Sequence, residues 1–139
     1  MRFVGRLFKS GRYWAVEVPI LDVATQGRSK KEALEMIADA VEMLVDRKEF
    51  KVKVFPGQGG EFTIGASDDA ALTALLLRRL RLKSLLSLAD VAARLGSNSP
   101  NSYARYEQGR SVPSIQKLSR LFAAVAPGKD FVLIESRAS

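Results

Sequence analysis

Residues 87–116, SLADVAARLGSNSPNSYARYEQGRSVPSIQ, decide the fold of the C-terminal half of the chain. The stretch opens with Ser87 and Asp90, a spacing that is typical of the capping box at a helix start. Apolar residues then recur at i, i+3, i+4 and i+7 from Leu88 to Leu95, which predicts one apolar stripe on a short helix. Gly96 is expected to end that helix, because glycine adopts a left-handed backbone at little cost.

A second short helix is predicted after a polar turn. Ser99 is the expected N-cap and Pro100 the first helical residue, where no N–H is needed. Tyr103 and Tyr106 are expected to point inward, and Gly109 ends the helix. Two such helices joined by a tight turn predict a helix-turn-helix. The alternative is a plain helical hairpin whose stripe is only core, but helices this short rarely carry so polar an outer face without a use.

The same residues resemble a known family. LADVAARLG followed by YARYEQGRSVPS resembles the Cro and phage-repressor (XRE-type) DNA-binding domain, over residues 75–125. The ending formed by Tyr106, Glu107 and Gly109 is fairly specific to that family, whereas the turn between Gly96 and Tyr103 is slightly longer than its commonest spacing. The resemblance implies binding to double-stranded operator DNA.

The second helix of this motif lies in the major groove, with its N-terminal residues at the base edges. Asn101 carries an amide that can pair with adenine, and Arg105 a guanidinium that can pair with guanine. Ser99 and Ser102 are further candidates at the same helix start. Contacts to phosphates are expected around the motif. The candidates for these contacts are Ser87, Arg110 and Ser111.

The charge of the chain is positive and uneven. The formal net charge of the 139 residues is +7, of which residues 1–66 contribute +2 and residues 67–139 contribute +5. A basic half attracts a polyanion and makes binding depend on salt. No apolar run is long enough for a membrane span and no signal peptide opens the chain, so we expect a cytoplasmic protein without a membrane partner.

The N-terminal half alternates in a way that predicts a small sheet. Residues 2–9 and 13–18 are expected to form a β-hairpin, with a third short strand at residues 23–26. A capping box at Ser29 and Glu32 starts a helix over residues 30–46, after which residues 51–55 return to the sheet. Residues 61–64 are a further candidate strand. The order β-β-β-α-β predicts an α+β fold, with one helix on one face of the sheet.

A Pro/Gly-rich stretch at residues 56–60 marks the break between two domains. We place the first domain at residues 1–66 and an all-α helix-turn-helix domain at residues 67–139. The second domain starts with a helix over residues 70–83 that buries Leu72, Leu75, Leu76 and Leu80. Its C-terminal end is crowded by Arg78, Arg79, Arg81 and Lys83, which either complement the helix dipole or contact phosphates.

The first domain also resembles a family. The hairpin, Thr25-Gln26-Gly27, Ser29-x-x-Glu32-Ala33-Leu34 and the following helix and strand resemble the N-terminal domain of HicB-type antitoxins, over residues 2–56. That family's Asp-Leu-Pro-Gly loop is missing, and residues 19–23 read PILDV instead. The resemblance implies a degenerate RNase H-like fold that binds and blocks a small basic HicA-like toxin, which degrades mRNA. The pairing of such a domain with an XRE-type reader strengthens both resemblances.

The toxin contact is expected on the open face of the sheet. Trp14 shares its side of the strand with Val16 and Val18, so we predict that it belongs to the core. Tyr13 and Glu17 then lie on the open face, available to a basic partner.

The end of the chain carries an unusual apolar run. Ser114 is expected to cap a helix with Ile115, Leu118, Leu121 and Phe122 inward, and residues 130–135, DFVLIE, are strand-like. A strand after a helical bundle has no partner in its own domain, so it would join the first domain's sheet or a second copy of the chain. We favour the second copy, giving a homodimer or higher symmetric oligomer. The dimerisation residues would be Phe131, Val132, Leu133 and Ile134.

Catalysis is not expected. The sequence contains no Cys and no His, and the acids of the N-terminal half are spread over a helix as on a solvated face. The glycines at 57–60 lack the following Lys-Ser/Thr of a phosphate-binding loop. We expect no metal or cofactor. The sequence therefore predicts an antitoxin that neutralises a HicA-like toxin and represses its own operon. The alternative is a stand-alone phage-type repressor whose first domain is a sensor or an oligomerisation module.

Overall fold

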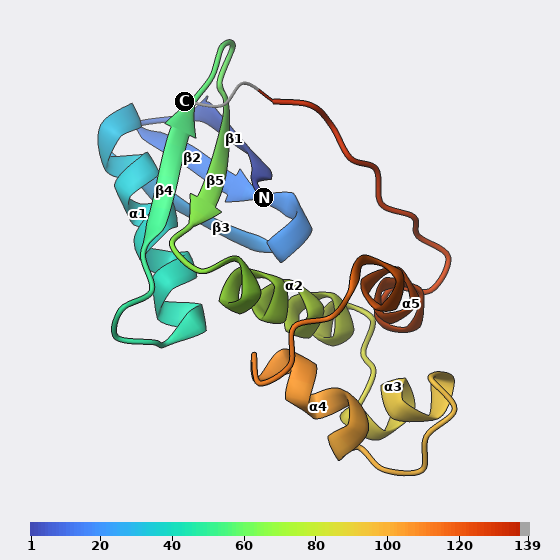
Figure 1. Cartoon of the computed structure of the whole chain (residues 1–139). Coiled ribbons are helices and arrows are strands. Elements are labelled where there is room, and N and C mark those ends of the chain that lie inside the picture. Colours follow the sequence, from blue (N-terminus) through green and yellow to red (C-terminus); the bar gives the residue numbers. More distant parts are fainter. Residues whose placement is uncertain (137–139) are drawn as a thin grey trace. The chain divides into compact units, whose positions relative to one another are not determined.

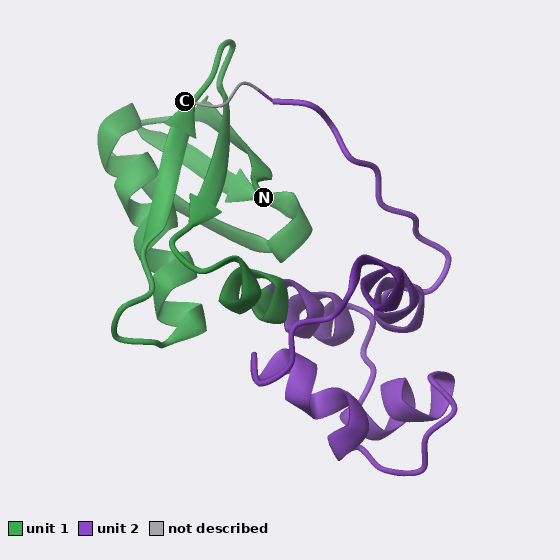
Figure 2. Cartoon of the chain, in the orientation of Figure 1, with its two compact units in different colours: residues 1–75 green, residues 76–139 purple. Residues whose placement is uncertain are grey.

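The structure, a computed structural model, describes residues 1–136 and has the predicted α+β class. The chain divides into two compact units (Figure 2). Residues 1–75 form the sheet unit and the residues from 76 onward form the helical unit, with the division inside one helix, α2 (Asp69–Lys83). Each unit has its own buried core.

The sheet unit is a five-stranded antiparallel sheet in the order β3-β2-β1-β5-β4 (Figure 1). The predicted hairpin, third strand and returning strand are confirmed, and the further candidate strand is also present. This candidate strand, residues 61–66, pairs with β1, so that the last strand in the sequence lies inside the sheet. The strands are β1 (Phe3–Ser10), β2 (Tyr13–Val18), β3 (Val23–Gly27), β4 (Val52–Pro56) and β5 (Glu61–Ala66).

One helix, α1 (Lys30–Val45), covers one face of this sheet (Figure 1). Ala33, Ile37 and Val41 are buried on α1, and Val16 and Val18 are buried beneath it. Ser29 is the N-cap as predicted, because the Glu32 N–H donates to Ser29 Oγ at 3.1 Å. The predicted capping box is not complete, because the Glu32 carboxylate accepts the N–H of Arg28, at 2.8 Å, instead of that of Ser29. A short 3-10 helix, η1 (Pro19–Leu21), connects β2 to β3.

The helical unit contains most of α2, followed by α3 (Leu88–Arg94), α4 (Asn101–Glu107) and α5 (Ile115–Val125). The predicted inward residues of α2 and α4 are buried, with Tyr103 completely enclosed. Of the predicted stripe on α3, Val91 and Ala92 are buried, whereas Leu88 and Leu95 at its two ends are half-buried. Tyr103 Oη has no hydrogen-bond partner among the described residues. Burial, followed by the neighbouring Glu107 carboxylate, raises the pKa of Tyr103.

The first three of these helices end in the same way. In each, the residue just past the C-cap has a positive φ and the next N–H reaches back five residues, the pattern of a Schellman motif. The backbone N–H groups are the donors. That of Leu86 donates to the Arg81 carbonyl at 3.2 Å, that of Ser97 donates to the Ala92 carbonyl at 2.9 Å, and that of Arg110 donates to the Arg105 carbonyl at 3.0 Å. The residues with positive φ are Leu85, Gly96 and Gly109.

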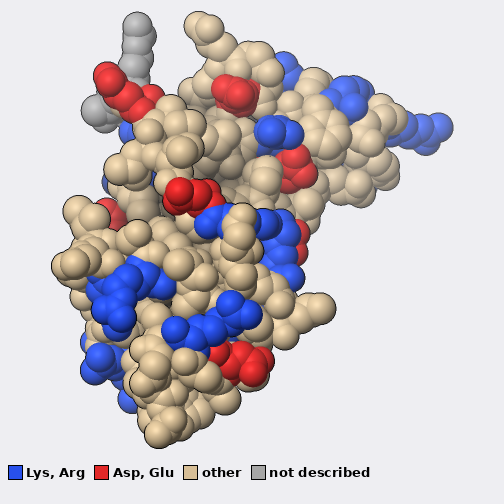
Figure 3. Space-filling model, turned by 90° about the vertical axis from the view of Figure 1, so that its right-hand side faces the viewer, with Lys and Arg blue, Asp and Glu red and all other residues tan. Residues whose placement is uncertain are grey.

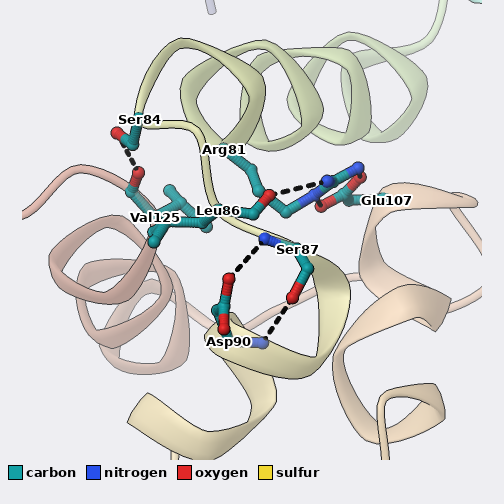
Figure 4. Close-up of polar contacts among 7 residues, drawn as sticks. All are labelled: Arg81, Ser84, Leu86, Ser87, Asp90, Glu107 and Val125. Carbon is teal, nitrogen blue, oxygen red and sulfur yellow. Dashed lines mark hydrogen bonds and ion pairs between the residues drawn. The ribbon is translucent and has the colours of Figure 1, made fainter.

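A buried ion pair ties the end of α2 to the end of α4 (Figure 4). Arg81 Nε donates to Glu107 Oε2 at 2.7 Å and Arg81 Nη2 to Glu107 Oε1 at 2.9 Å, while Arg81 Nη1 donates to the Leu86 carbonyl at 3.0 Å. The two side chains are only 13% and 6% exposed. The hydrogen bonds with Glu107 raise the pKa of Arg81, so that the guanidinium stays charged despite its burial.

A second link closes the unit from α5. Ser84 Oγ, just past the end of α2, donates to the Val125 carbonyl at 2.7 Å (Figure 4). The end of α2 is thus fixed to both α4 and α5 by side chains from adjacent turns.

Three local predictions for this unit were wrong. Ser99 is not the N-cap of α4: Pro100 occupies that position, and the Ser99 carbonyl accepts the Ser102 hydroxyl at 2.8 Å instead. Ile115 is 90% exposed, because it begins α5 where the helix is not yet covered. Residues 130–136 form no strand, since no ladder partner reaches them within the described part of the chain.

The first prediction concerns the positive φ of Leu85. Leu85 is 91% exposed, so its side chain contributes little packing, while a left-handed backbone costs a non-glycine residue about 1 kcal/mol or more. Leu85→Gly is therefore expected to raise the free energy of unfolding by about 1 kcal/mol in urea titrations. Leu85→Ala, which keeps the Cβ, should leave stability nearly unchanged. A destabilised glycine variant would contradict the assigned turn.

The second prediction concerns the buried ion pair. Glu107→Gln leaves the Arg81 charge buried without a counter-charge, which is expected to cost about 3–5 kcal/mol of unfolding free energy. The double variant Arg81→Met with Glu107→Leu should recover most of that loss, because no buried charge remains. Lys51→Met removes an exposed ammonium from its pair with the half-buried Glu42 and should cost less than about 1 kcal/mol, because water still solvates the pair. An equal effect for both pairs would refute the structural role of Arg81.

Candidate nucleic-acid interface

The capping box at the start of α3 is formed as predicted. The Asp90 N–H donates to Ser87 Oγ at 3.0 Å, and the Ser87 N–H donates to Asp90 Oδ2 at 2.8 Å (Figure 4). These hydrogen bonds from Ser87 hold the pKa of Asp90 below its usual value. The Ser87 hydroxyl is therefore used inside the motif, and the Asp90 carboxylate opposes a phosphate at this helix start.

Helix α4 separates its buried and exposed residues cleanly. Tyr103, Ala104 and Tyr106 are buried, while Asn101 and Arg105 are exposed. The opposite face of α4 is thereby available to a ligand. An amide and a guanidinium on the exposed face of a short helix are the groups that read adenine and guanine in a major groove.

The serines near α4 differ in what they offer. Ser99 is exposed, and Ser97 Oγ accepts its N–H at 3.2 Å. Ser102 is half-buried and its hydroxyl proton is directed to the Ser99 carbonyl. Its lone pairs can still accept a hydrogen bond from an amino group of a base.

Arg105 is oriented by the aromatic ring beside it. Its guanidinium carbon lies 5.1 Å from the centre of the Tyr106 ring, and Nη2 donates to Tyr106 Oη at 3.4 Å. Lys117 of α5 places its ammonium 5.9 Å from the same ring centre. The Tyr106 ring thus holds two cations close together, which favours a negatively charged ligand nearby.

Lys117 was not among the residues that we predicted from the sequence. It belongs to a different helix from Arg105, and only the packing of α5 against the motif brings the two together. In the sequence, Lys117 lies three residues after the Ser114 cap, a position that indicates the first turn of a helix and nothing about a ligand.

The loop after α4 carries the other predicted phosphate contacts. Arg110 is exposed and Ser111 is half-buried, directly after the Schellman ending of the helix. Several Lys and Arg side chains are visible in Figure 3, with acidic side chains among them. Of the basic cluster on α2, Arg81 belongs to the buried ion pair and is not available to DNA.

The open face of the sheet carries both apolar and charged side chains. Val4, Phe8 and Tyr13 are exposed there, as predicted for Tyr13. Glu17 also lies on this face, but Arg6 is directly opposite it in the β1–β2 register and balances its charge. A partner of this face would therefore be selected by apolar contact more than by negative charge.

Trp14 lies on the α1 side of β2, at the margin of the core, and is half-buried. The ammonium groups of Lys9 and Lys30 lie 5.3 and 4.9 Å from its ring centre. Its side of the strand agrees with the prediction, whereas its burial is only partial because β2 begins there.

Two further features bear on function. Within residues 1–136, His, Cys, Asp and Glu side chains form no group of three or more that could hold a metal ion. No helix among these residues is both long and apolar enough to cross a membrane.

Residues 74–126 match a protein family described as a helix-turn-helix domain. A search of curated proteins found no match to the chain. The matched segment contains α3, α4 and α5 and the exposed face that carries Asn101 and Arg105. The C-terminal half of this chain is thus a helix-turn-helix domain, preceded by an N-terminal antiparallel sheet domain, and its expected partner is DNA.

Proposed function

We propose that the chain is a transcriptional repressor that reads operator DNA with the exposed face of α4. The observation that carries the proposal is the division of this helix: Tyr103 and Tyr106 are buried, and Asn101 and Arg105 face outward within a helix-turn-helix domain. Arg110 and Lys117 would add phosphate contacts, with Ser99, Ser102 and Ser111 as minor contributors.

The proposal assigns Ser87 mainly to the capping box. Only the remaining N–H groups at the start of α3 would face a phosphate, and the Asp90 carboxylate weakens that contact. Because operator DNA is the ligand, the proposed location is the cytoplasm. No catalytic step is assigned to the chain.

The finer proposal is that the chain is an antitoxin whose sheet unit binds a HicA-like toxin. Two observations support it: the resemblance of residues 2–56 to HicB-type domains, and an exposed apolar sheet face around Val4, Phe8 and Tyr13. An exposed apolar patch of this kind is typical of a protein contact. Glu17 would lie at the margin of that contact, because Arg6 already offsets its charge.

A stand-alone repressor remains the alternative. The cheapest observation that separates the two is the neighbouring gene and co-purification of its product. An antitoxin requires a small basic protein encoded beside it, and that protein should copurify with this chain. Absence of both would leave only the repressor.

The third prediction tests base reading by Arg105. A bidentate contact to guanine is worth about 1–3 kcal/mol, so Arg105→Ala is expected to weaken binding to the DNA upstream of its own gene by roughly ten- to a hundredfold. Arg105→Lys keeps the charge without the planar fork and should lose discrimination between sequences while keeping non-specific binding. Fluorescence anisotropy with specific and scrambled duplexes measures both. Unchanged operator affinity in Arg105→Ala would eliminate this assignment.

The fourth prediction tests the phosphate contact of Arg110. Arg110→Gln is expected to lower the affinity about equally for all duplexes and to reduce the slope of log K against log salt by roughly one. Arg110→Lys retains the charge and should keep the slope of the unaltered protein. A loss that depends on sequence would show that Arg110 reads a base instead.

The fifth prediction tests the toxin contact. Tyr13→Ala removes an exposed ring from the open sheet face, and is expected to reduce rescue of cells that express the neighbouring toxin gene. Tyr13→Phe retains the ring and should rescue normally. Circular dichroism checks that both variants fold. Full rescue by Tyr13→Ala would place the contact elsewhere.

A further inference from the structure

The segment after α5 is held at one point and unpaired beyond it. The rings of Phe131 and Phe122 pack in a tilted arrangement with centroids 4.4 Å apart, which fixes the start of the segment to α5. The next three residues, Val132, Leu133 and Ile134, are 80%, 104% and 76% exposed and belong to no helix or strand. Three consecutive β-branched or large apolar side chains in water have a strong tendency to form a strand once a partner supplies the ladder.

We propose that residues 129–135 pair in antiparallel register with the same segment of a second copy of the chain. An antiparallel pair of identical segments has a two-fold axis at its centre, which is the symmetry of most soluble dimers. The inference rests on the proposed operator binding in one respect only, that two half-sites need two readers.

Charge complementarity selects the register. Three registers place the apolar run, residues 131–134, opposite the same run of the second copy, and they differ in where the two-fold axis crosses the strand. With the axis between Val132 and Leu133, Asp130 lies opposite Glu135, which places like charges together. With the axis at Leu133, Glu135 lies opposite Phe131. With the axis at Val132, Lys129 lies opposite Glu135, Phe131 opposite Leu133 and Asp130 opposite Ile134. Of the three registers, this one alone pairs opposite charges and places no like charges together.

The register centred on Val132 also extends an existing contact. Residues 129, 131, 133 and 135 share one side of the strand because side chains alternate. Phe131 already packs on Phe122, so the partner's Leu133 would lie beside Phe131 at the margin of the α5 core. The segment would thus cover apolar surface of both copies at once.

The absence of cysteine in the sequence allows a direct test on the full chain. In the proposed register, residue 132 faces its own counterpart, with Cα atoms about 4.5–5.5 Å apart, within the range of a disulfide. Val132→Cys is therefore expected to form a disulfide-linked dimer almost completely under mild oxidation. Ile134→Cys is the matched control: it is similarly exposed, but two copies of residue 134 would be about 14 Å apart, beyond the reach of a disulfide.

A charge swap tests the same register without oxidation. Lys129→Glu and Glu135→Lys each place like charges opposite one another at two symmetric positions, and each is expected to weaken the dimer about tenfold in analytical ultracentrifugation. The double variant restores both pairs and should regain the original dissociation constant. Neither measurement contains DNA, so a failure here is distinct from a failure of operator reading by Arg105.

Three results would overturn the proposal. The first is a full-length chain that sediments as a monomer at micromolar concentration. The second is cross-linking of Ile134→Cys as complete as that of Val132→Cys. The third is an unchanged oligomer when the chain ends after Lys129, which would remove the segment from the interface.

Discussion

The arrangement of the helical unit depends on the Arg81–Glu107 ion pair. Helices α3 and α4 have only seven residues each, and helices of this length are unstable in water without tertiary contacts. The guanidinium of Arg81 bonds to the end of α4 and to the Leu86 carbonyl in the turn before α3, so one side chain fixes both helices to α2. The face of α4 that we propose reads DNA is therefore positioned from its buried side.

Features that depend on neighbouring residues could be predicted from the sequence. The capping box at Ser87, the N-cap at Ser29, the helix end at Gly96 and the inward tyrosines all follow from hydrogen bonds and periodicities within one turn or one strand. The base-reading candidates Asn101 and Arg105 followed from the same logic, because a helix with a known buried face has a known exposed face. Ser99 was misassigned by one residue, since Pro100 itself adopts the helical backbone and is the N-cap.

Contacts between distant residues could not be predicted in this way. Glu107 was noted as part of a motif and Arg81 as part of a basic cluster, but they are 26 residues apart and nothing local indicates that they pair. The same holds for Lys117, which approaches the Tyr106 ring from another helix, and for β5, which lies inside the sheet beside β1 although it comes last among the strands. Counting basic residues consequently overestimates the cations that remain for DNA, because one of them stabilises the fold.

The C-terminal segment shows why strand prediction differs in kind from helix prediction. A helix satisfies its backbone within its own residues, whereas a strand requires a second strand beside it. The side chains of residues 131–134 favour a strand, but within residues 1–136 no strand pairs with them, and residues 132–134 stay exposed. The wrong prediction of a strand and the exposed apolar run thus have one cause, a missing ladder partner. The segment is anchored at Phe131, and its backbone beyond that residue has no strand to pair with. Since two DNA half-sites require two helix-turn-helix domains, a second copy of the same segment is the partner that we propose.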